Sequence, residues 1–483
     1  MAKTHQNLID GKWQPARDGE TYENLNPADT RDVIGRFAAS GPADVEASFS
    51  AAAAALPAWS DMPAPKRGEI LFRAADLLEQ RLADIAEGMT REEGKTLPEA
   101  RGEAGRAAHV LRYFGGEGAR LTGETVPSER PGVFAFTMRR PLGVVALITP
   151  WNFPIAIPAW KLGPALISGN TVVLKPAAPT PLTAVRLAEA LQDAGLPPGV
   201  LNLITGPSSR SGKAILADER LKAVSFTGSC STGDSLREKL DPRGIRSQLE
   251  MGGKNPTIVL RDADLEQAVE IVAGSAFHST GQKCTATSRV IVEKPILGAF
   301  TEALVERTRR MRVGPGLQDS IEIGPCIDAK QMKTVLDYIE IGKQGGAKLL
   351  CGGRRLEEGE LQHGFFVEPT IFGGVTASMI IARQEIFGPV LAVMEASDMD
   401  EALALANGVS FGLSASLVTR DLSAAMRYIK EIEAGIIMVN LPSAGVEYQL
   451  PFGGLKASSS GRREQGSVAI DFFTDLCTVY VRG

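Results

Sequence analysis

Short apolar or β-branched runs alternate with amphipathic helical segments from Gly143 onward, and this alternation constrains the fold more than any other feature of the chain. The runs occupy residues 143–148, 171–174, 200–204, 222–226, 256–260 and 289–292. Such alternation is typical of βαβ units, in which helices cover both faces of a parallel sheet. The glycine-rich segment 252–254 separates two series of runs, so the sequence predicts two α/β domains.

The residues before Gly143 differ in character. They are rich in alanine with helical spacing over residues 44–56, 66–93 and 99–114, which predicts a layer of helices. The length of 483 residues is sufficient for two to four structural units. An apolar fraction of 44% with 23% charged residues indicates a folded globular protein.

Charge and targeting features narrow the class of partner. A net charge of −5 provides no general cationic field for nucleic acid, so we expect none as a partner. The N-terminal residues lack the apolar segment of a signal peptide, so a cytoplasmic protein is expected. The uncharged stretch 143–160 contains Pro150, Pro154 and Pro158, which argue against a membrane-spanning helix and predict a strand, a turn and a helix start.

The cysteines and histidines support neither a metal site nor a disulfide framework. The five cysteines are widely scattered with no CxxC pair: Cys230, Cys284, Cys326, Cys351 and Cys477. No two of the four histidines stand at metal-ligand spacing, so metal-dependent hydrolysis and a Ser-His-Asp triad both lack support. We therefore expect no metal and a reducing compartment.

Two glycine-containing segments bear on phosphate binding. Residues 206–214 imitate a Walker loop, but five residues separate the glycines and no Ser or Thr follows Lys213, so a nucleotide-bound magnesium ion would lack its ligand. Thr227-Gly228-Ser229 follows a predicted strand and precedes a helix whose N-terminus offers N–H groups to a pyrophosphate. A glycine turn with a serine cap also explains this second segment without any ligand.

Cys284 and Glu250 are the strongest candidates for chemistry. Cys284 lies in a polar, glycine-containing turn beside Lys283, a cation that favours the thiolate. Glu250 ends an apolar strand ahead of two glycines, where a carboxylate with a raised pKa acts as a base. A buried inert thiol and a partnered surface carboxylate are the structural alternatives.

Seven motifs occur in one order along the chain. They are Thr149-Pro150-Trp151-Asn152-Phe153-Pro154, Lys175-Pro176, Phe226-Thr227-Gly228-Ser229, Glu250-Met251-Gly252-Gly253-Lys254, Gly281-Gln282-Lys283-Cys284, Glu385-Ile386-Phe387-Gly388-Pro389 and Pro451-Phe452-Gly453-Gly454. This series resembles the NAD(P)-dependent aldehyde dehydrogenase superfamily over nearly the whole chain. Met251 replaces the usual leucine, a departure that does not touch the chemistry.

The resemblance implies a covalent mechanism. Cys284 matches the thiolate that attacks the aldehyde, and Asn152 matches the amide that holds the resulting oxyanion. Glu250 matches the base that activates water to hydrolyse the thioester, so the implied product is a free carboxylic acid. CoA-acylating relatives typically lack this glutamate.

The resemblance also implies a cofactor site for NADP or NAD. The matched positions are Trp151, Lys175, Thr227, Gly228, Ser229, Glu385 and Phe387. NAD-preferring relatives often carry a glutamate at the position of Ala178, whose carboxylate would repel a 2′-phosphate. With alanine there, Lys175 and Arg210 are expected to pair with a 2′-phosphate, and NADP is expected to serve at least as well as NAD. A solvated Arg210 is the structural alternative.

By the same resemblance the fold is α/β, with two Rossmann-type α/β domains and a small β oligomerisation arm. The implied cofactor-binding domain comprises residues 1–122 and 141–252, and the catalytic domain comprises 253–452. Residues 123–140 and 453–483 are expected to form the arm. Strand patterns at 133–140 and 478–482 agree with this expectation, and such strands predict a homodimer or homotetramer.

The substrate is less constrained, because pocket residues lie on loops between the motifs. Runs 151–166, 250–256, 279–290 and 443–456 look most like bacterial enzymes that oxidise α-ketoglutaric (2,5-dioxovaleric) semialdehyde. Succinic semialdehyde and a broader range of aldehydes are alternatives, as is a catalytically silent relative. Arg112 and Lys283 are the cations expected to bind the carboxylate of a semialdehyde, and a solvated surface role is the alternative for each.

Overall fold

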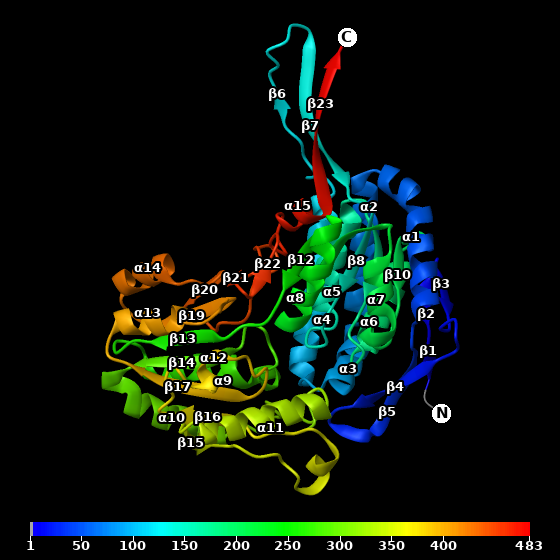
Figure 1. Cartoon of the computed structure of the whole chain (residues 1–483). Coiled ribbons are helices and arrows are strands. Elements are labelled where there is room, and N and C mark those ends of the chain that lie inside the picture. Colours follow the sequence, from blue (N-terminus) through cyan, green and yellow to red (C-terminus); the bar gives the residue numbers. More distant parts are fainter. Residues whose placement is uncertain (1–2) are drawn as a thin grey trace.

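The computed structural model describes residues 3–483 and shows two α/β bodies with a narrow arm projecting from one of them (Figure 1). The first body is built on an eight-stranded sheet in the order β22-β12-β11-β8-β9-β10-β2-β3. Its strands are β2 (Asn7–Ile9), β3 (Lys12–Gln14), β8 (Val144–Ile148), β9 (Thr171–Lys175), β10 (Leu201–Leu203), β11 (Leu221–Thr227), β12 (Arg246–Glu250) and β22 (Ser459–Ser460). The five central strands, β12 to β10, run parallel, as the alternation predicts.

Helices cover both faces of this sheet. They are α1 (Pro42–Asp61), α2 (Ala64–Gln80), α3 (Leu82–Glu93), α4 (Leu97–Glu117), α5 (Ala156–Ile167), α6 (Pro181–Asp193), α7 (Ser208–Ala217) and α8 (Cys230–Leu240). Successive residues of β8 point to opposite faces, so Val145 and Leu147 join one hydrophobic core while Val144 and Ala146 join another. The uncharged stretch 143–160 forms β8, a turn and the start of α5, as predicted.

The helices predicted over 44–56, 66–93 and 99–114 are present as α1 to α4, with 66–93 divided into α2 and α3, and the residues before α1 form strands instead. Before α1 lie β1 (Thr4–His5), β4 (Thr21–Asn26) and β5 (Asp29–Ala38), which form a separate three-stranded sheet. β2 pairs with β10, about two hundred residues further along the chain. β4 and β5 form a local antiparallel hairpin, whereas β2 depends on a partner distant in the sequence.

The second body holds a seven-stranded sheet in the order β15-β16-β17-β14-β13-β19-β20. Its strands are β13 (Asn255–Val259), β14 (Thr287–Glu293), β15 (Lys348–Cys351), β16 (Thr370–Gly373), β17 (Val390–Ala396), β19 (Ser414–Val418) and β20 (Ile436–Val439). The surrounding helices are α9 (Leu265–Phe277), α10 (Leu297–Arg309), α11 (Ala329–Gln344), α12 (Ile380–Arg383), α13 (Met399–Asn407) and α14 (Leu422–Glu431). All strands except β15 pair in parallel, so the prediction of a second α/β sheet is confirmed.

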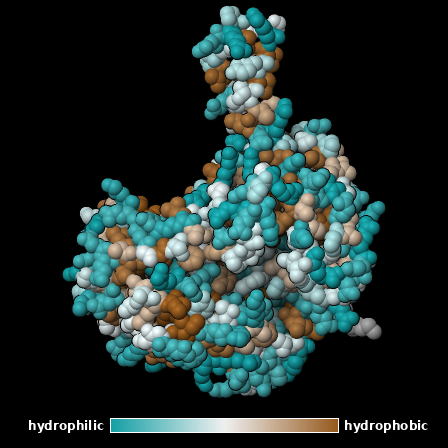
Figure 2. Space-filling model, in the orientation of Figure 1, coloured by the Kyte–Doolittle hydropathy of each residue, from teal (hydrophilic) through white to brown (hydrophobic). Residues whose placement is uncertain are grey.

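The arm consists of β6 (Thr125–Val126), β7 (Val133–Pro141) and β23 (Thr474–Arg482). β7 and β23 pair antiparallel along their whole lengths, from Val133↔Arg482 to Pro141↔Thr474. Figure 2 shows hydrophobic side chains among the polar ones of this projection. Leu476 and Tyr480 are 62% and 61% exposed, so the arm presents apolar surface that this chain does not cover.

Residues 453–473, assigned above to the arm, lie instead against the two bodies. β21 (Leu455–Lys456) pairs with β18 (Phe411–Gly412), and β22 extends the first sheet beside β12. α15 (Ala469–Phe473) packs on α5. No helix formed by residues 3–483 combines the length and apolar character needed to cross a membrane.

Candidate functional site

A cavity of about 790 Å³ opens where β8, β9 and β11 end in the first sheet. Ligands bind at this edge in open α/β sheets because the helix N-termini that follow the strands point toward it. Five of the residues expected to bind the cofactor line the cavity: Trp151, Lys175, Thr227, Gly228 and Ser229. Ser229 caps α8 by accepting a hydrogen bond from the backbone N–H of Thr232.

The charge of this cavity suits an anionic ligand. Among residues 3–483, those that line it include Lys175, Lys213 and Lys239 but no Asp or Glu. Lys175 is buried and donates to the carbonyl of Pro176 at 2.8 Å, and burial lowers its pKa to about 8. The lining, with a capped helix start beside three lysines, therefore fits the phosphates of a dinucleotide.

Two residues expected at the ribose lie outside this lining. Arg210 forms an ion pair with Asp18 and donates from Nε to the carbonyl of Ala39 at 2.9 Å. Neither Asp18 nor Ala39 lines the cavity, so these contacts do not support the expectation that Arg210 pairs with a 2′-phosphate there. Ala178 is not part of the lining either, although its neighbours Pro176 and Ala177 are.

Glu385 and Phe387 approach the connection between the two sheets from the second body. Glu385 accepts a hydrogen bond from the backbone N–H of Gly253 at 2.9 Å, and burial raises its pKa to about 7. A Cβ atom on Gly252 would lie 2.0 Å from Oε2 of Glu385, so only glycine admits this carboxylate. The ring of Phe387 packs edge-on against Trp151 with centroids 5.3 Å apart, which joins it to the cavity wall.

The loop that carries Cys284 adopts an unusual backbone conformation. Ser279, Thr280 and Gly281 all have positive φ, at 53°, 59° and 64°. A Cβ on Gly281 would lie 2.3 Å from the carbonyl oxygen of Gly388, so the close approach requires glycine here. Left-handed conformations at non-glycine residues cluster at functional sites, where surrounding contacts hold them.

Two asparagines hold this loop by hydrogen bonds to its backbone. Nδ2 of Asn255 donates to the carbonyl oxygen of Cys284 at 2.7 Å. Nδ2 of Asn152 donates to the carbonyl oxygen of Gln282 at 3.0 Å, and the Asn152 side chain is buried. Asn152 and Cys284, 132 residues apart in the sequence, are thereby brought to one place.

The Cys284 thiol does not lie in a field that favours its ionisation. Burial raises its pKa, and the carboxylates of Glu385 and Glu250 raise it further. The charge of Lys283 helps to lower the pKa of Glu99, so a charged partner other than a Cys284 thiolate lies within its electrostatic reach. The thiol form of Cys284 is favoured in this state.

Glu250 lies at the end of β12 and is buried, with 1% of the residue exposed. Oε2 accepts a hydrogen bond from Oγ of Ser459, whereas Oε1 is buried without a partner. Burial raises the pKa of Glu250 well above its ordinary value, and the nearby charge of Glu464 raises it further; Ser459 and Lys161 oppose the shift. A buried carboxyl with one free oxygen has the form expected of a general base.

The pattern that defines the aldehyde dehydrogenase family matches residues 13–479. The chain belongs to this family. It is 49% identical over 479 residues to the alpha-ketoglutaric semialdehyde dehydrogenase of Bacillus subtilis, covering 99% of this chain and 98% of that protein. It is 45% identical over 481 residues to the 2,5-dioxopentanoate dehydrogenase of Saccharolobus solfataricus, covering 99% of each.

Solved structures agree with this family assignment. An NAD-dependent aldehyde dehydrogenase from Sinorhizobium meliloti superimposes with a TM-score of 0.96 at 37% identity, covering all of this chain and 95% of that one. An NADP-dependent enzyme from E. coli superimposes with a TM-score of 0.95 at 36% identity, covering all of this chain and 98% of that one. The chain is thus an aldehyde dehydrogenase, an enzyme that oxidises an aldehyde to an acid.

This aldehyde dehydrogenase also contains site residues that the sequence did not reveal. Lys161 and Glu464 form an ion pair whose side chains are each 1% exposed, and the indole N–H of Trp160 donates to Glu464 at 2.7 Å. The pair lies within electrostatic reach of Glu250. In the sequence Lys161 is one residue of a predicted helix, and Glu464 lies in a loop 214 positions after Glu250. No local pattern therefore links Lys161 or Glu464 to Glu250.

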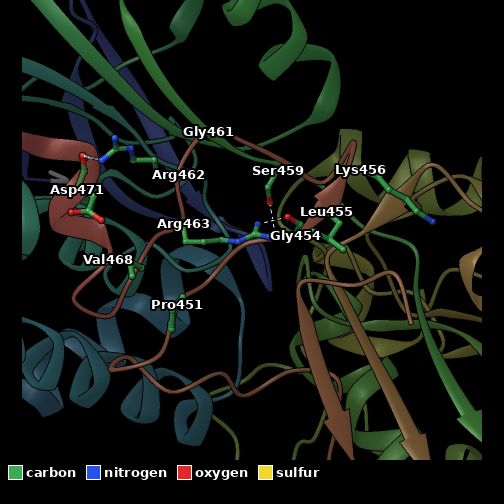
Figure 3. Close-up of a pocket in the computed structure, with 10 residues that line it drawn as sticks. All are labelled: Pro451, Gly454, Leu455, Lys456, Ser459, Gly461, Arg462, Arg463, Val468 and Asp471. Atoms are coloured by element: carbon green, nitrogen blue, oxygen red, sulfur yellow. Dashed lines mark hydrogen bonds between the residues drawn. The ribbon is translucent and has the colours of Figure 1, made fainter. Parts of the chain in front are cut away.

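Ser459 reaches Glu250 from the wall of a second cavity, of about 590 Å³. Figure 3 shows Ser459, Gly454 and Arg463 converging there. The N–H of Gly454 donates to Oγ of Ser459 at 2.6 Å, and Arg463 donates to the carbonyl of Gly454. These contacts fix the serine that supports the carboxyl of Glu250.

Arg112 does not reach the site. It lies on α4 and forms ion pairs with Asp76 and Glu79 on the neighbouring α2, at 2.5 and 2.6 Å. Both acids are more than 40% exposed, so the cluster belongs to the solvated surface. The structural alternative is therefore correct for Arg112, while the role of Lys283 in substrate binding stays a prediction.

Proposed function

We propose that this aldehyde dehydrogenase oxidises α-ketoglutaric semialdehyde to 2-oxoglutarate. The observation that carries this proposal is the 45–49% identity, over essentially the whole chain, to three enzymes named for this substrate. Succinic semialdehyde, one carbon shorter with the same terminal carboxylate, is the second candidate. Both substrates require a cation in the pocket, remote from the aldehyde carbon.

The proposed reaction begins at Cys284. The thiol proton passes to solvent water, the sulfur adds to the aldehyde carbon, and the electron pair of the opened C=O bond makes the carbonyl oxygen an oxyanion. Asn152 is proposed to donate to that oxygen, using the amide hydrogen that its hydrogen bond to Gln282 leaves free. A dinucleotide held by Lys175, Thr227 and Ser229 would supply the hydride acceptor, and loss of hydride from the thiohemiacetal would leave a thioester on Cys284.

Glu250 is proposed to activate the water that hydrolyses this thioester. Its unpartnered Oε1 accepts a proton from water as the water oxygen attacks the acyl carbon, and the C–S bond then breaks to release the acid and the thiolate of Cys284, which afterwards takes back a proton. Lys161 and Glu464 bias the charge of Glu250 in opposite directions. They are thereby proposed to set the pH at which the base is available.

NADP is proposed to serve at least as well as NAD. The support is the absence of an acid in the described lining of the cavity together with Lys175, Lys213 and Lys239, since a 2′-phosphate adds two negative charges. In this proposal residues 1–122 and 141–252 bind the cofactor and residues 253–452 carry the nucleophile. Lys213 and Lys239 replace Arg210 as the expected partners of the phosphates.

The arm is proposed to bind further copies of this chain, as a homodimer or homotetramer. The support is the exposed Leu476 and Tyr480 on a strand whose other edge is open. A cytoplasmic location is also proposed, because all five cysteines are unpaired and the reaction needs a reduced Cys284.

The experiment that tests the function is a steady-state assay of cofactor reduction. The quantity to compare is kcat/KM for α-ketoglutaric semialdehyde, succinic semialdehyde and pentanal, each with NADP and NAD. We expect the first substrate to give the highest value and NADP to match or exceed NAD. A preference for pentanal would contradict the proposed substrate class, and a hundredfold preference for NAD would contradict the proposed cofactor.

A further inference from the structure

Arg106 on α4 lies at the contact between α4 and α5, two turns before the surface residue Arg112. Its guanidinium carbon lies 6.0 Å from the ring centroid of Trp160 on α5. Nη2 donates to Oε1 of Gln465 at 3.1 Å. Three residues earlier on the same face of α4, Glu103 binds the start of α5, so this face is directed toward the catalytic centre.

Two buried donors beside this contact have no partner. They are Nε of Arg106 and Nε2 of Gln465, both shielded from solvent and without a hydrogen-bond acceptor. A buried polar group without a partner is rare and costly, and it often marks a place where a ligand supplies the missing acceptor. Gln465 is completely buried and has a φ of 58°, a conformation that a non-glycine residue adopts rarely.

The charge of Arg106 is also uncompensated. No Asp or Glu within residues 3–483 lies within 4.0 Å of its guanidinium, in contrast to Arg112 with its two acids. Glu103 and Glu447 act on it only through longer-range attraction, and burial lowers its pKa. A half-buried guanidinium without a carboxylate partner is costly, so binding a carboxylate there would be favourable.

Aromatic rings connect this position to the nucleophile. Trp160 packs on Phe452 with ring centroids 5.4 Å apart. Phe452 belongs to the small apolar cluster against which Cys284 packs. Arg106 is thus connected to the surroundings of Cys284 through one aromatic pair, Trp160 and Phe452, so a single substrate with an aldehyde at one end and an anion at the other is expected to reach both.

We propose that Arg106 and Gln465 form the subsite for the carboxylate of the semialdehyde substrate. Nε and Nη2 lie on one edge of a guanidinium and match the two oxygens of a carboxylate. A carboxylate at this edge also accepts from Nε2 of Gln465, so all the unpartnered donors are satisfied together. This inference rests on the proposed function, because it assigns the residues that recognise the acid end of the same substrate.

The test compares an acidic and a neutral aldehyde of equal length in matched variants. Arg106→Met is expected to lower kcat/KM for α-ketoglutaric semialdehyde roughly 30- to 300-fold, mainly through KM, and to change that for pentanal less than about threefold. Arg106→Lys, which keeps the charge but not the fork, is expected to recover part of the loss. Arg112→Met is the control and should leave both substrates unchanged, because its partners are surface acids.

Gln465→Glu provides a second test that does not remove the arginine. The introduced carboxylate is expected to pair with Arg106 and repel the acidic substrate, so activity on the acidic aldehyde should be lost while activity on pentanal is retained. Equal losses on both aldehydes, or no loss on the acidic one, would overturn the subsite. A wild-type enzyme that shows no preference for the acidic aldehyde would instead overturn the proposed function, so the two failures are distinguishable.

Discussion

Lys95 and Glu103 form a buried ion pair that supports both ends of the turn carrying Asn152. The side chains are 1% and 2% exposed, and Nζ of Lys95 also donates to the carbonyl oxygen of Asn152 at 2.7 Å. Oε1 of Glu103 accepts from the N–H groups of Ile155 and Ala156, at 3.0 and 3.1 Å. Burial alone would lower the pKa of Lys95, but Glu103 and Glu93 raise it above its usual value.

Breaking this pair is expected to be costly. Lys95→Met leaves the carboxylate of Glu103 buried without its cation, so the free energy of unfolding should fall by about 3–5 kcal/mol. Urea denaturation measures the change. The double variant Lys95→Met with Glu103→Gln removes both charges and should lose less than the sum of the two single variants. Additive losses would show that the two charges do not interact.

Replacing the nucleophile and the base should affect different steps. Cys284→Ala is expected to abolish cofactor reduction, because no thiohemiacetal forms. Glu250→Gln is expected to keep a burst of one reduced cofactor per active site and then stall, because only hydrolysis needs the base. Stopped-flow absorbance measures both phases. Loss of the burst in the glutamate variant would place Glu250 before the thioester.

The raised pKa of Glu250 predicts a hydrolysis rate that increases with pH. Since only the ionised carboxylate accepts a proton, the active fraction grows as pH rises through the raised value. Glu464→Gln removes a negative neighbour and lowers the pKa of Glu250, so the rise of the hydrolysis rate should occur at lower pH. Lys161→Met removes a positive neighbour, so this rise should occur at higher pH. The decay of the isolated acyl-enzyme, followed by mass spectrometry across pH, tests the direction of both shifts. An unchanged pH dependence of the hydrolysis rate in the two variants would contradict them.

Cofactor preference should respond to charge in the 790 Å³ cavity. Lys213→Ala is expected to weaken NADP binding by about 1–3 kcal/mol more than NAD binding, since a charge-assisted contact to the 2′-phosphate is lost. Ala178→Glu, directly beside the lining residue Ala177, should shift preference toward NAD by about 1–3 kcal/mol through repulsion of the 2′-phosphate. Isothermal titration calorimetry provides the ratio of the Kd values for NADP and NAD. Arg210→Ala serves as the control and should leave it unchanged, because that guanidinium pairs with Asp18.

The arm should control assembly. Replacing Leu476 and Tyr480 together with aspartate places two charges on the apolar surface of β23 and is expected to reduce the mass measured by light scattering to that of one chain. Leu317→Asp changes an exposed leucine outside the arm and should leave the mass unaltered. An unchanged mass in the double variant would show that subunits associate elsewhere.

Local pattern was sufficient for much of this fold and for the central chemistry. Short apolar runs that alternate with helical spacing predicted the two α/β sheets, because each parallel strand must bury both faces and each covering helix one. The strands of the arm were visible at 133–140 and 478–482 from their own strand patterns. Motifs near Cys284, Glu250 and Asn152 carried a resemblance to the family because glycines and strand ends at those places serve one purpose, the close approach of backbone to ligand.

Three-dimensional packing settled what spacing left open. Arg106 and Arg112 lie on one helix, and the residues around them in the sequence do not show which arginine contacts buried groups. In the structure Arg106 contacts Trp160 and Gln465, whereas Arg112 pairs with surface acids. Lys161 and Glu464 meet Glu250 only when β12 and the C-terminal loop come together. The charge state of a buried group depends on burial and on neighbours from distant segments, which is why the sequence suggested a thiolate at Cys284 and the fold favours a thiol.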